Sequence, residues 1–391
     1  MANFTSLNGI SCDNVTSVNG VSKSSINNVD GLDACDSNPA MSRLVAGFDD
    51  KFVSYAPTAN IPTTLTWENN AYASRGESDW DFRDIAYGKD DSGNPFYVGV
   101  RATDTQNIIF STSTNFIDSA GTWTLCDTGQ GPIMYTVLWG NNVWVVAGQL
   151  TGTFKIWRST DGSTWSSVNI SGLTGIDTAG ATNIKALTSD GSGTWWFGVG
   201  TKIYKSTDNA ASWSLEHTLD MGASGNGIKD LVFTNNSVIC LYHYNDGSGT
   251  NQARVITAAS SDTTDWGTAT HLIYGSDSLH SSKTNRCAAG NGRVVFIDTH
   301  NSLAADVNGK TFTVLDSYNS VRTNGSANCI ATDGEGNWWI GSDGETSGGS
   351  SGGDIFASSN NGITFAQGAN GIKKSGNKKV EALAVDRYLP L

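Results

Sequence analysis

The 391-residue chain has few charged side chains and no apolar run long enough to cross a membrane. Charged residues make up 16% of the sequence. Nowhere do about 18 apolar residues follow one another, as a spanning helix requires. The residues after Met1 lack the basic start and the apolar core of a secretory signal. We therefore expect a chain that is made in a cytoplasm and is not inserted into a membrane.

Positive charge is scarce. The net charge is −13, the isoelectric point is near 4.7, and no basic stripe with interleaved aromatics is present. Such a field repels phosphate backbones, so nucleic acid is not an expected partner. One basic cluster stands out and is interpreted as a solvated loop; it consists of Lys373, Lys374, Lys378 and Lys379.

Cysteine and histidine show no metal-ligand spacing, so neither a metal nor another cofactor is expected. Three of the six cysteines, Cys240, Cys287 and Cys329, lie in apolar segments and are interpreted as small buried hydrophobes. Cys12 and Cys35 form a candidate disulfide pair. The five histidines have no nucleophile motif beside them and are interpreted as turn or loop residues.

The sequence does contain a repeated turn. Residues 159–165 read Ser-Thr-Asp-Gly-Ser-Thr-Trp between two apolar segments, and variants recur along the chain. Seven copies close on an aromatic residue, and these are Trp67, Trp123, Trp165, Trp213, Trp266, Phe312 and Phe365. The residues given a structural role in the turns are Ser159, Asp161, Gly162, Trp165, Ser206, Asp208, Trp213, Asn360, Gly362 and Phe365. A period of roughly 40 to 55 residues is typical of propellers and solenoids, whose units are small sheets.

The strand pattern predicts a closed ring. Four apolar segments fall in each full unit, and in one unit they are residues 135–139, 143–148, 154–159 and 164–168. The first unit lacks its innermost strand, whereas one strand remains after the last unit has closed. We therefore expect an all-β fold, a seven-bladed β-propeller of four-stranded blades over residues 41–391. Its last blade would combine a C-terminal strand at 380–386 with N-terminal strands at 43–67.

Residues 1–40 carry a shorter repeat. Leu7-Asn-Gly-Ile10, Val18-Asn-Gly-Val21 and Val29-Asp-Gly-Leu32 recur every eleven residues. Ser22 could cap a turn of helix that ends at Gly31, so each unit is expected to be a helical turn followed by a glycine bend. A segment this short cannot bury enough surface to order itself. We expect it to act as an anchor arm that orders against a partner or against copies of itself.

The closing turn resembles the Asp box, or BNR repeat, of sialidase-like and photosystem-assembly-factor-like propellers. The resemblance covers residues 43–391 and implies a propeller in which the turn joins the third and fourth strands, away from the ligand face. The arm is similar to short N-terminal repeats of bacteriophage structural proteins, which attach a receptor-binding or decorating domain to the particle. This second resemblance implies a virion location and a role in decoration or host recognition.

No catalytic set emerges from the sequence. A sialidase-like enzyme needs three clustered arginines and a tyrosine nucleophile, and the family's Arg-Ile-Pro motif is absent. One polar column precedes the apolar column of the innermost strands, and it consists of Asp84, Thr136, Lys185, Asp230, Arg286, Asn328 and Glu381. The column is interpreted either as a ring of contacts between blades or as a ligand site at the channel mouth. Trp80, flanked by carboxylates, is a second candidate for ligand binding or for capping a blade.

These patterns favour a non-enzymatic phage virion protein that decorates the capsid or belongs to a fibre or tail. Its partners would be other virion proteins, bound through residues 1–40, and a glycan or protein of the host surface. The alternative is a carbohydrate-binding propeller, either a lectin or a glycoside hydrolase, with Trp80 and the polar column as its site.

Overall fold

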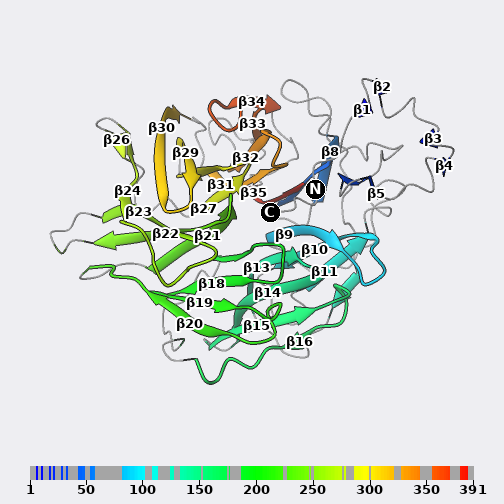
Figure 1. Ribbon diagram of the computed structural model, residues 1–391, viewed down its shortest axis with the longest axis horizontal. Coiled ribbons are helices and arrows are strands. Elements are labelled where there is room, and N and C mark those ends of the chain that lie inside the picture. The colour runs from blue at the N-terminus through cyan, green and yellow to red at the C-terminus, as the bar shows by residue number, and fades with distance from the viewer. Residues whose placement is uncertain are drawn as a thin grey trace.

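The computed structural model consists of short β-strands joined by turns and loops (Figure 1). It describes residues 6–7, 10–11, 17–18, 21–22, 28–29, 32–33, 43–48, 53–57, 82–101, 108–112, 124–126, 133–150, 153–173, 176, 186–222, 227–245, 247, 251–274, 277–278, 286–298, 301–320, 327–343, 355–369 and 379–385. Within these residues, no helix is long and apolar enough to cross a bilayer.

Six four-stranded antiparallel sheets follow one another, each built from consecutive strands. The first three contain β9 (Phe82–Lys89), β10 (Pro95–Arg101), β11 (Ile108–Thr112) and β12 (Thr124–Cys126); β13 (Ile133–Gly140), β14 (Val143–Leu150), β15 (Thr153–Ser159) and β16 (Ser166–Ser167); and β17 (Leu187–Ser189), β18 (Trp195–Val199), β19 (Lys202–Ser206) and β20 (Ser214–Thr218). The next three contain β21 (Gly227–Thr234), β22 (Ser237–Asn245), β23 (Asn251–Ala259) and β24 (Thr270–His271); β27 (Arg286–Gly290), β28 (Arg293–Ile297), β29 (Asn301–Asn308) and β30 (Thr311–Ser320); and β31 (Ala327–Thr332), β32 (Trp338–Ser342), β33 (Ile355–Ser358) and β34 (Ala366–Ala369). A small hairpin, β25 (Ile273–Tyr274) and β26 (Asp277–Ser278), follows the fourth of these sheets.

A further sheet joins the two ends of the propeller sequence. Its order is β35 (Val380–Val385), β7 (Arg43–Phe48) and β8 (Val53–Pro57), with Leu383 opposite Ala46 and Ala384 opposite Val45. The predicted pairing of the C-terminal strand with the N-terminal strands is confirmed. The expected fourth strand of this sheet, residues 65–67, lies outside the described residues.

The first strands of the sheets form a closed series of contacts. β9 contacts β13 on one side and β35 on the other, and the contacts continue in chain order through β17, β21, β27 and β31. Figure 1 shows the sheets arranged about a centre, with β35 and β7 beside β9. The chain is therefore an all-β propeller of four-stranded antiparallel blades.

The second strands form the most buried part of each sheet. β18, β28 and β32 have the sequences WWFGV, RVVFI and WWIGS, and every residue in them is buried. Such strands are covered on both faces, so they are mostly apolar rather than alternating, and Arg293 and Ser342 are the polar residues among them. Tight two-residue turns lead into several of them, with positive φ at Asn141 and Asn142 and again at Asn235 and Asn236.

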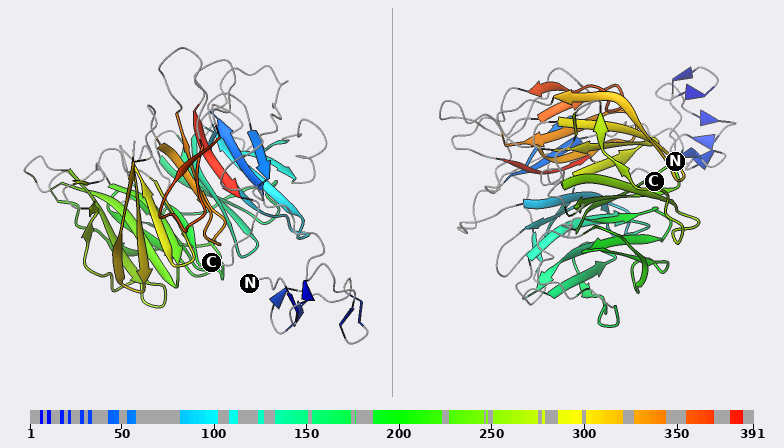
Figure 2. Two further views of the ribbon diagram at one scale, coloured as in Figure 1. Left: turned by 90° about the horizontal axis from the view of Figure 1, so that it is seen from above. Right: turned by 90° about the vertical axis from the view of Figure 1, so that its left-hand side faces the viewer.

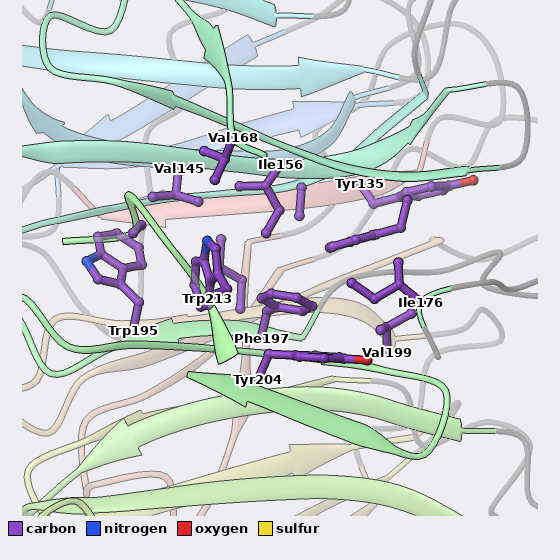
Figure 3. Close-up of a cluster of buried hydrophobic side chains, with 14 of the residues drawn as sticks. Tyr135, Val145, Ile156, Val168, Ile176, Trp195, Phe197, Val199, Tyr204 and Trp213 are labelled. Carbon is purple, nitrogen blue, oxygen red and sulfur yellow. The ribbon is translucent and has the colours of Figure 1, made fainter. Parts of the chain in front are cut away.

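Apolar side chains from adjacent sheets form the core between them. In the cluster of Figure 3, Val145 and Ile156 come from the second sheet, and Trp195, Phe197 and Trp213 come from the third or its closing turn. The ring centroids of Phe197 and Trp213 lie 4.7 Å apart in an edge-on arrangement. A ring pair of this kind contributes about 0.5–1.5 kcal/mol beyond its buried area.

The cysteines within the described residues are part of this core. Cys126, Cys240, Cys287 and Cys329 are buried thiols, as the sequence indicated for the last three. Burial raises the pKa of the Cys126 thiol to about 12, with the nearby Asp161 carboxylate acting in the same direction. Cys12 and Cys35 lie outside the described residues, so their pairing stays a prediction.

The arm contains hairpins where a helical turn was expected. Its strands pair as β1 (Ser6–Leu7) with β2 (Ile10–Ser11), β3 (Ser17–Val18) with β4 (Val21–Ser22), and β5 (Asn28–Val29) with β6 (Leu32–Asp33). The eleven-residue period is confirmed, but the helix-cap role of Ser22 is wrong, because Ser22 pairs with Ser17 in a strand. Asn-Gly or Asp-Gly between paired strands favours a two-residue hairpin turn over a helix. Figure 2 shows these strands to one side of the propeller sheets.

Candidate functional site

The polar column lies beside irregularities at the start of the first strands. Strand register shifts between Val100 and Arg101 opposite β9, and it shifts beside Thr136 in β13 and Asp230 in β21. The shifts recur next to Asn328 in β31 and Glu381 in β35. A bulge re-aims the adjacent side chain. The irregularity accompanies most described members of the column but not Arg286, because the pairing of β27 with β28 is regular.

Asp84 connects the first sheet to the second. Its Oδ1 accepts the backbone N–H of Ile85 at 3.0 Å. Its Oδ2 accepts the Thr136 hydroxyl at 2.7 Å and the backbone N–H of Val137 at 3.1 Å. Both carboxylate oxygens are thus engaged, one within β9 and the other on β13. Because two of the three donors are backbone groups, the contact also holds the relative height of the two strands.

Asp230 repeats the same arrangement between the fourth and fifth sheets. Its Oδ1 accepts the N–H of Leu231 and its Oδ2 accepts the N–H of Cys287, both at 2.9 Å. The side chain is buried, and this burial raises the pKa of Asp230 to about 7 against the effects of Arg286 and the two N–H donors. The Asp84 carboxylate adds to the upward shift, which places both acids within one electrostatic cluster.

Arg286 crosses the centre of the ring. Its Nη2 donates to the backbone carbonyl oxygen of Arg83 at 3.4 Å, although the two residues are 203 positions apart in the chain. The Nε of Arg286 is buried and has no hydrogen-bond partner among the described residues. The positive charge of this guanidinium stabilises the ionised form of Asp230. The centre of the propeller therefore holds a mixed-charge cluster of Asp84, Asp230 and Arg286.

Of the remaining candidates, Asn328 and Glu381 lie in described first strands, whereas two others lie outside the described residues. Asn328 donates to Asp343 at 2.6 Å and to the carbonyl oxygen of Val380 at 3.3 Å, which again joins adjacent sheets. Glu381 lies in β35 and is half-buried. Lys185 and Trp80 lie outside the described residues, so their roles stay predictions. Within the described part of the chain, no three His, Cys, Asp or Glu side chains are grouped closely enough to hold a metal ion.

The closing turns stand between the third and fourth strands of their sheets. Ser159 Oγ donates to Asp161 at 2.8 Å and accepts the N–H of Gly162 at 2.8 Å. Asp161 in turn accepts the N–H groups of Ser163 at 2.8 Å and Thr164 at 2.6 Å. Burial alone would raise the pKa of Asp161, but these donors outweigh it and hold the pKa well below its usual range.

Two further turns preserve this network. Ser206 donates to Asp208 at 2.7 Å and accepts the N–H of Ala210 at 3.0 Å. Ser358 donates to Asn360 at 2.8 Å and accepts the N–H of Gly362 at 3.1 Å. The side-chain oxygens of Asp161, Asp208 and Asn360 accept hydrogen bonds from their own turns, and this geometry fits a structural role. Trp165, Trp213 and Phe365 follow the turns and pack in hydrophobic clusters between sheets.

One polar cluster, on the fourth sheet, was not predicted from the sequence. The guanidinium carbon of Arg254 lies 3.5 Å from the ring centroid of Tyr244 on the fourth sheet, with His271 on the adjacent strand. Its members lie in three strands separated by loops of unequal length, so no motif connects them. The sequence does contain one signal for this cluster. Tyr244 and Arg254 each lie within five residues of the loop that joins β22 to β23, so an arginine and an aromatic residue can face each other across this hairpin.

Solved structures share the propeller fold, whereas no protein-family model and no curated protein matches the chain. A candidate 6-phosphogluconolactonase from Bacteroides fragilis superposes with a TM-score of 0.55 at 12% identity, covering 90% of this chain and 99% of that one. YCF48 from Cyanidioschyzon merolae gives 0.47 at 16% identity, with 74% and 84% covered. TolB from Acinetobacter baumannii gives 0.43 at 12% identity, with 78% and 66% covered. At these identities the likeness concerns the fold alone.

Proposed function

We propose that the chain is a non-enzymatic structural protein of a bacteriophage virion, in which residues 1–40 attach a propeller to the particle. The observation that carries this proposal is that the strands of residues 1–40 pair separately from the strands of the propeller sheets. The strands β1 to β6 pair only with one another, in three hairpins at an eleven-residue period. None of them belongs to a propeller sheet, so the arm is available for another surface.

The hairpins are too small to be stable alone. Each has two described residues per strand, and an isolated two-stranded hairpin is marginal in water even when it is longer. Ordering such a segment costs about 1–2 kcal/mol per residue in backbone entropy. Contacts with other virion proteins would offset that cost and would make attachment and ordering the same event.

The propeller itself is proposed to be a seven-bladed Asp-box domain. Six four-stranded sheets and the sheet of β35, β7 and β8 support this count, as does the closed series of contacts among the first strands. Three closing turns in which a serine hydroxyl donates to an Asp or Asn side chain two residues on support the resemblance. A ring that closes on its own terminal strands suits a domain displayed outside the cell, because it leaves few exposed strand edges.

The central carboxylates favour a structural role over catalysis. A general acid or base must reach the substrate, whereas Asp84 and Asp230 each direct both oxygens to hydrogen bonds within and between sheets. One observation favours the alternative, a carbohydrate-binding propeller with Trp80 and the polar column as its site. A buried carboxyl whose pKa is raised, as at Asp230, is common in functional sites.

Two experiments separate these functions. Deleting residues 2–36 should leave a soluble propeller that no longer joins phage particles, and retained incorporation would refute the attachment role. A glycan array on the full chain tests the alternative. Saturable glycan binding that is lost in Trp80→Ala would favour a lectin, and turnover of an oligosaccharide would overturn the assignment as a non-enzyme.

A further inference from the structure

A row of polar side chains crosses three strands of the fourth sheet. Tyr242 in β22 is paired with Arg254 in β23, and Arg254 is paired with His271 in β24. Tyr244 is paired with Gln252, one step closer to the loop between β22 and β23. Successive cross-strand partners on one face lie within contact distance of each other. The row therefore brings an arginine, a histidine and two tyrosines together.

The Arg254 guanidinium is held in a fixed orientation. It is stacked on Tyr244 with its central carbon 3.5 Å from the ring centroid, and its Nε donates to the side-chain oxygen of Gln252 at 2.8 Å. Stacking and one oriented bond fix the plane of the fork, whose Nη1 and Nη2 carry four further N–H donors. This is how a protein prepares a guanidinium for two-point contact with a planar or tetrahedral oxyanion.

No carboxylate neutralises this arginine among the described residues. The ion pairs found there join Lys205 to Glu216, Arg293 to Asp306, Lys310 to Asp265, and Lys379 to Asp343. Arg254 is half-buried and belongs to none of them. The Arg254 guanidinium is therefore half-buried without a carboxylate to balance its charge among the described residues, which leaves it suited to an anion from outside.

The charge of Arg254 acts on the two titratable side chains paired with it. Burial lowers the pKa of His271, and the Arg254 charge lowers it further. The pKa of Tyr242 is raised by burial, and Arg254 opposes that rise. Asp220, which precedes β21, is an acidic neighbour of Tyr242 and raises the phenol pKa further. An anion bound between Arg254 and His271 would remove the repulsion between the two cations and favour the protonated imidazole.

The row lies at the rim opposite the closing turns. The chain reverses at the closing turn after β23, so the far ends of β22 and β24 meet at the other rim. The connection from the third sheet is bonded to that rim, because the N–H of Asn245 donates to the carbonyl oxygen of Met221 at 3.1 Å. Tyr242 is buried, whereas Tyr244, Gln252, Arg254 and His271 are half-buried and partly accessible to solvent. The site is thus separate from the central cluster of Asp84, Asp230 and Arg286.

We propose that Arg254, Tyr244 and His271 form a binding site for an oxyanion group, either a carboxylate, a sulfate or a phosphate carried by a small ligand or glycan. Arg254 supplies the two-point contact, Gln252 and Tyr244 hold its plane, and His271 adds a second donor whose charge increases as pH falls. The ligand class follows from the fork geometry and from the absence of an acidic partner among the described residues.

The test is a titration of the full chain with sulfate, phosphate and D-glucuronate at constant ionic strength, with D-glucose as the neutral comparison. Histidine imidazole NMR signals should show a saturable shift at His271, and binding should raise the His271 pKa. Arg254→Gln should weaken binding at least about tenfold, which corresponds to 1.4 kcal/mol. His271→Gln should weaken it less and abolish the gain in affinity at low pH.

Lys155→Gln, which removes one positive charge from β15 in another sheet, is the matched control and should leave binding unchanged. Which of the three anions binds identifies the chemical source of the group. A response that fails to saturate with all three, or a saturable response that is equal in Arg254→Gln, would overturn the proposal. Circular dichroism and the unfolding midpoint of Arg254→Gln distinguish lost binding from lost folding, and intact folding with intact binding counts against the site.

Discussion

Asp230 Oδ2 accepts the backbone N–H of Cys287 at 2.9 Å and thereby joins the first strands of two sheets that share no strand pairing. Asp84 makes the equivalent bond to Val137 at 3.1 Å. Sheets in a propeller are otherwise held to each other mainly by side-chain packing, which sets their spacing but not their height. These carboxylates supply directional contacts between the first strands of neighbouring sheets.

The first prediction concerns Asp84→Asn. An asparagine amide has one accepting oxygen, so it cannot receive the Ile85 N–H on one atom and the Thr136 and Val137 donors on the other. A buried donor left unsatisfied costs about 1–3 kcal/mol. Urea unfolding should show a loss of this size. Asp91→Asn, at an exposed turn position, is the control and should change stability by less than about 0.5 kcal/mol.

The second prediction is a pH dependence that originates at Asp230. Its pKa is about 7 in the folded chain, whereas an unfolded aspartate has a pKa of about 3.9. Between these values the folded chain holds a proton that the unfolded chain has lost. The free energy of unfolding should therefore decrease as pH rises through this window, by up to about 1.4 kcal/mol per unit, and level off above about pH 7.

Comparison with Asp230→Asn isolates this contribution. Burial lowers the pKa values of His217 and His271. Their contribution to the free energy of unfolding therefore rises with pH, opposite to that of Asp230, and is lost as pH falls below about 6.5. That contribution is common to both proteins. The difference in unfolding free energy between wild type and variant, measured from pH 5 to pH 8, should have the slope of a single proton below about pH 7 and level off above it. Parallel curves would show that Asp230 keeps an ordinary pKa.

The third prediction concerns the closing turn at Gly162. Its φ is +73°, and an added Cβ would lie 2.6 Å from a ring carbon of Phe96 in the preceding sheet. Gly162→Ala should combine left-handed backbone strain with displacement of Phe96 and destabilise by at least about 2 kcal/mol. Gly309 has a φ of +61° with open space around it, so Gly309→Ala should show the backbone cost alone. Gly172→Ala has neither problem and should be close to neutral. Equal effects at all three glycines would contradict this explanation.

The fourth prediction concerns ring closure. Ending the chain at residue 379 removes β35, whose Val380, Leu383 and Val385 are buried against β7 and the sixth sheet. Both the strand pairing and the hydrophobic contact would be lost, so unfolding should occur at a much lower urea concentration, or the chain should become insoluble. Ending it at residue 385 keeps β35 and should preserve the midpoint. A midpoint unchanged by the larger deletion would show that the ring does not depend on this strand.

The positions of strands could be predicted from the sequence where a strand is buried and therefore apolar along its length. Residues 43–48 and 380–385 were predicted as strands from their apolar sequence, and they are β7 and β35. The arm was mispredicted because its apolar positions fit a short helix as well as a hairpin. The Asn-Gly pair between Leu7 and Ile10 was the decisive local signal, and a two-residue turn there requires the pairing that the structure shows.

The candidate site was predictable only as a column of positions. Sequence alignment of the first strands placed Asp84 and Asp230 in equivalent positions, but it could not show that each bonds the next strand, because that depends on the bulge. The contact of Arg286 with Arg83 depends on the width of the ring, and no local pattern encodes that width. Arg254 was missed because its partners come from strands whose pairing is a tertiary property.

Counting copies of this chain per purified particle tests whether residues 1–40 attach the propeller to a phage particle. Particles would be assembled with either the full chain or a chain lacking residues 2–36, and quantitative mass spectrometry would give the copy number relative to the capsid protein. We expect a fixed copy number for the full chain and almost none for the shortened one, which stays soluble in the lysate. Equal copy numbers for the two chains, or no full chain on the particles, would contradict it.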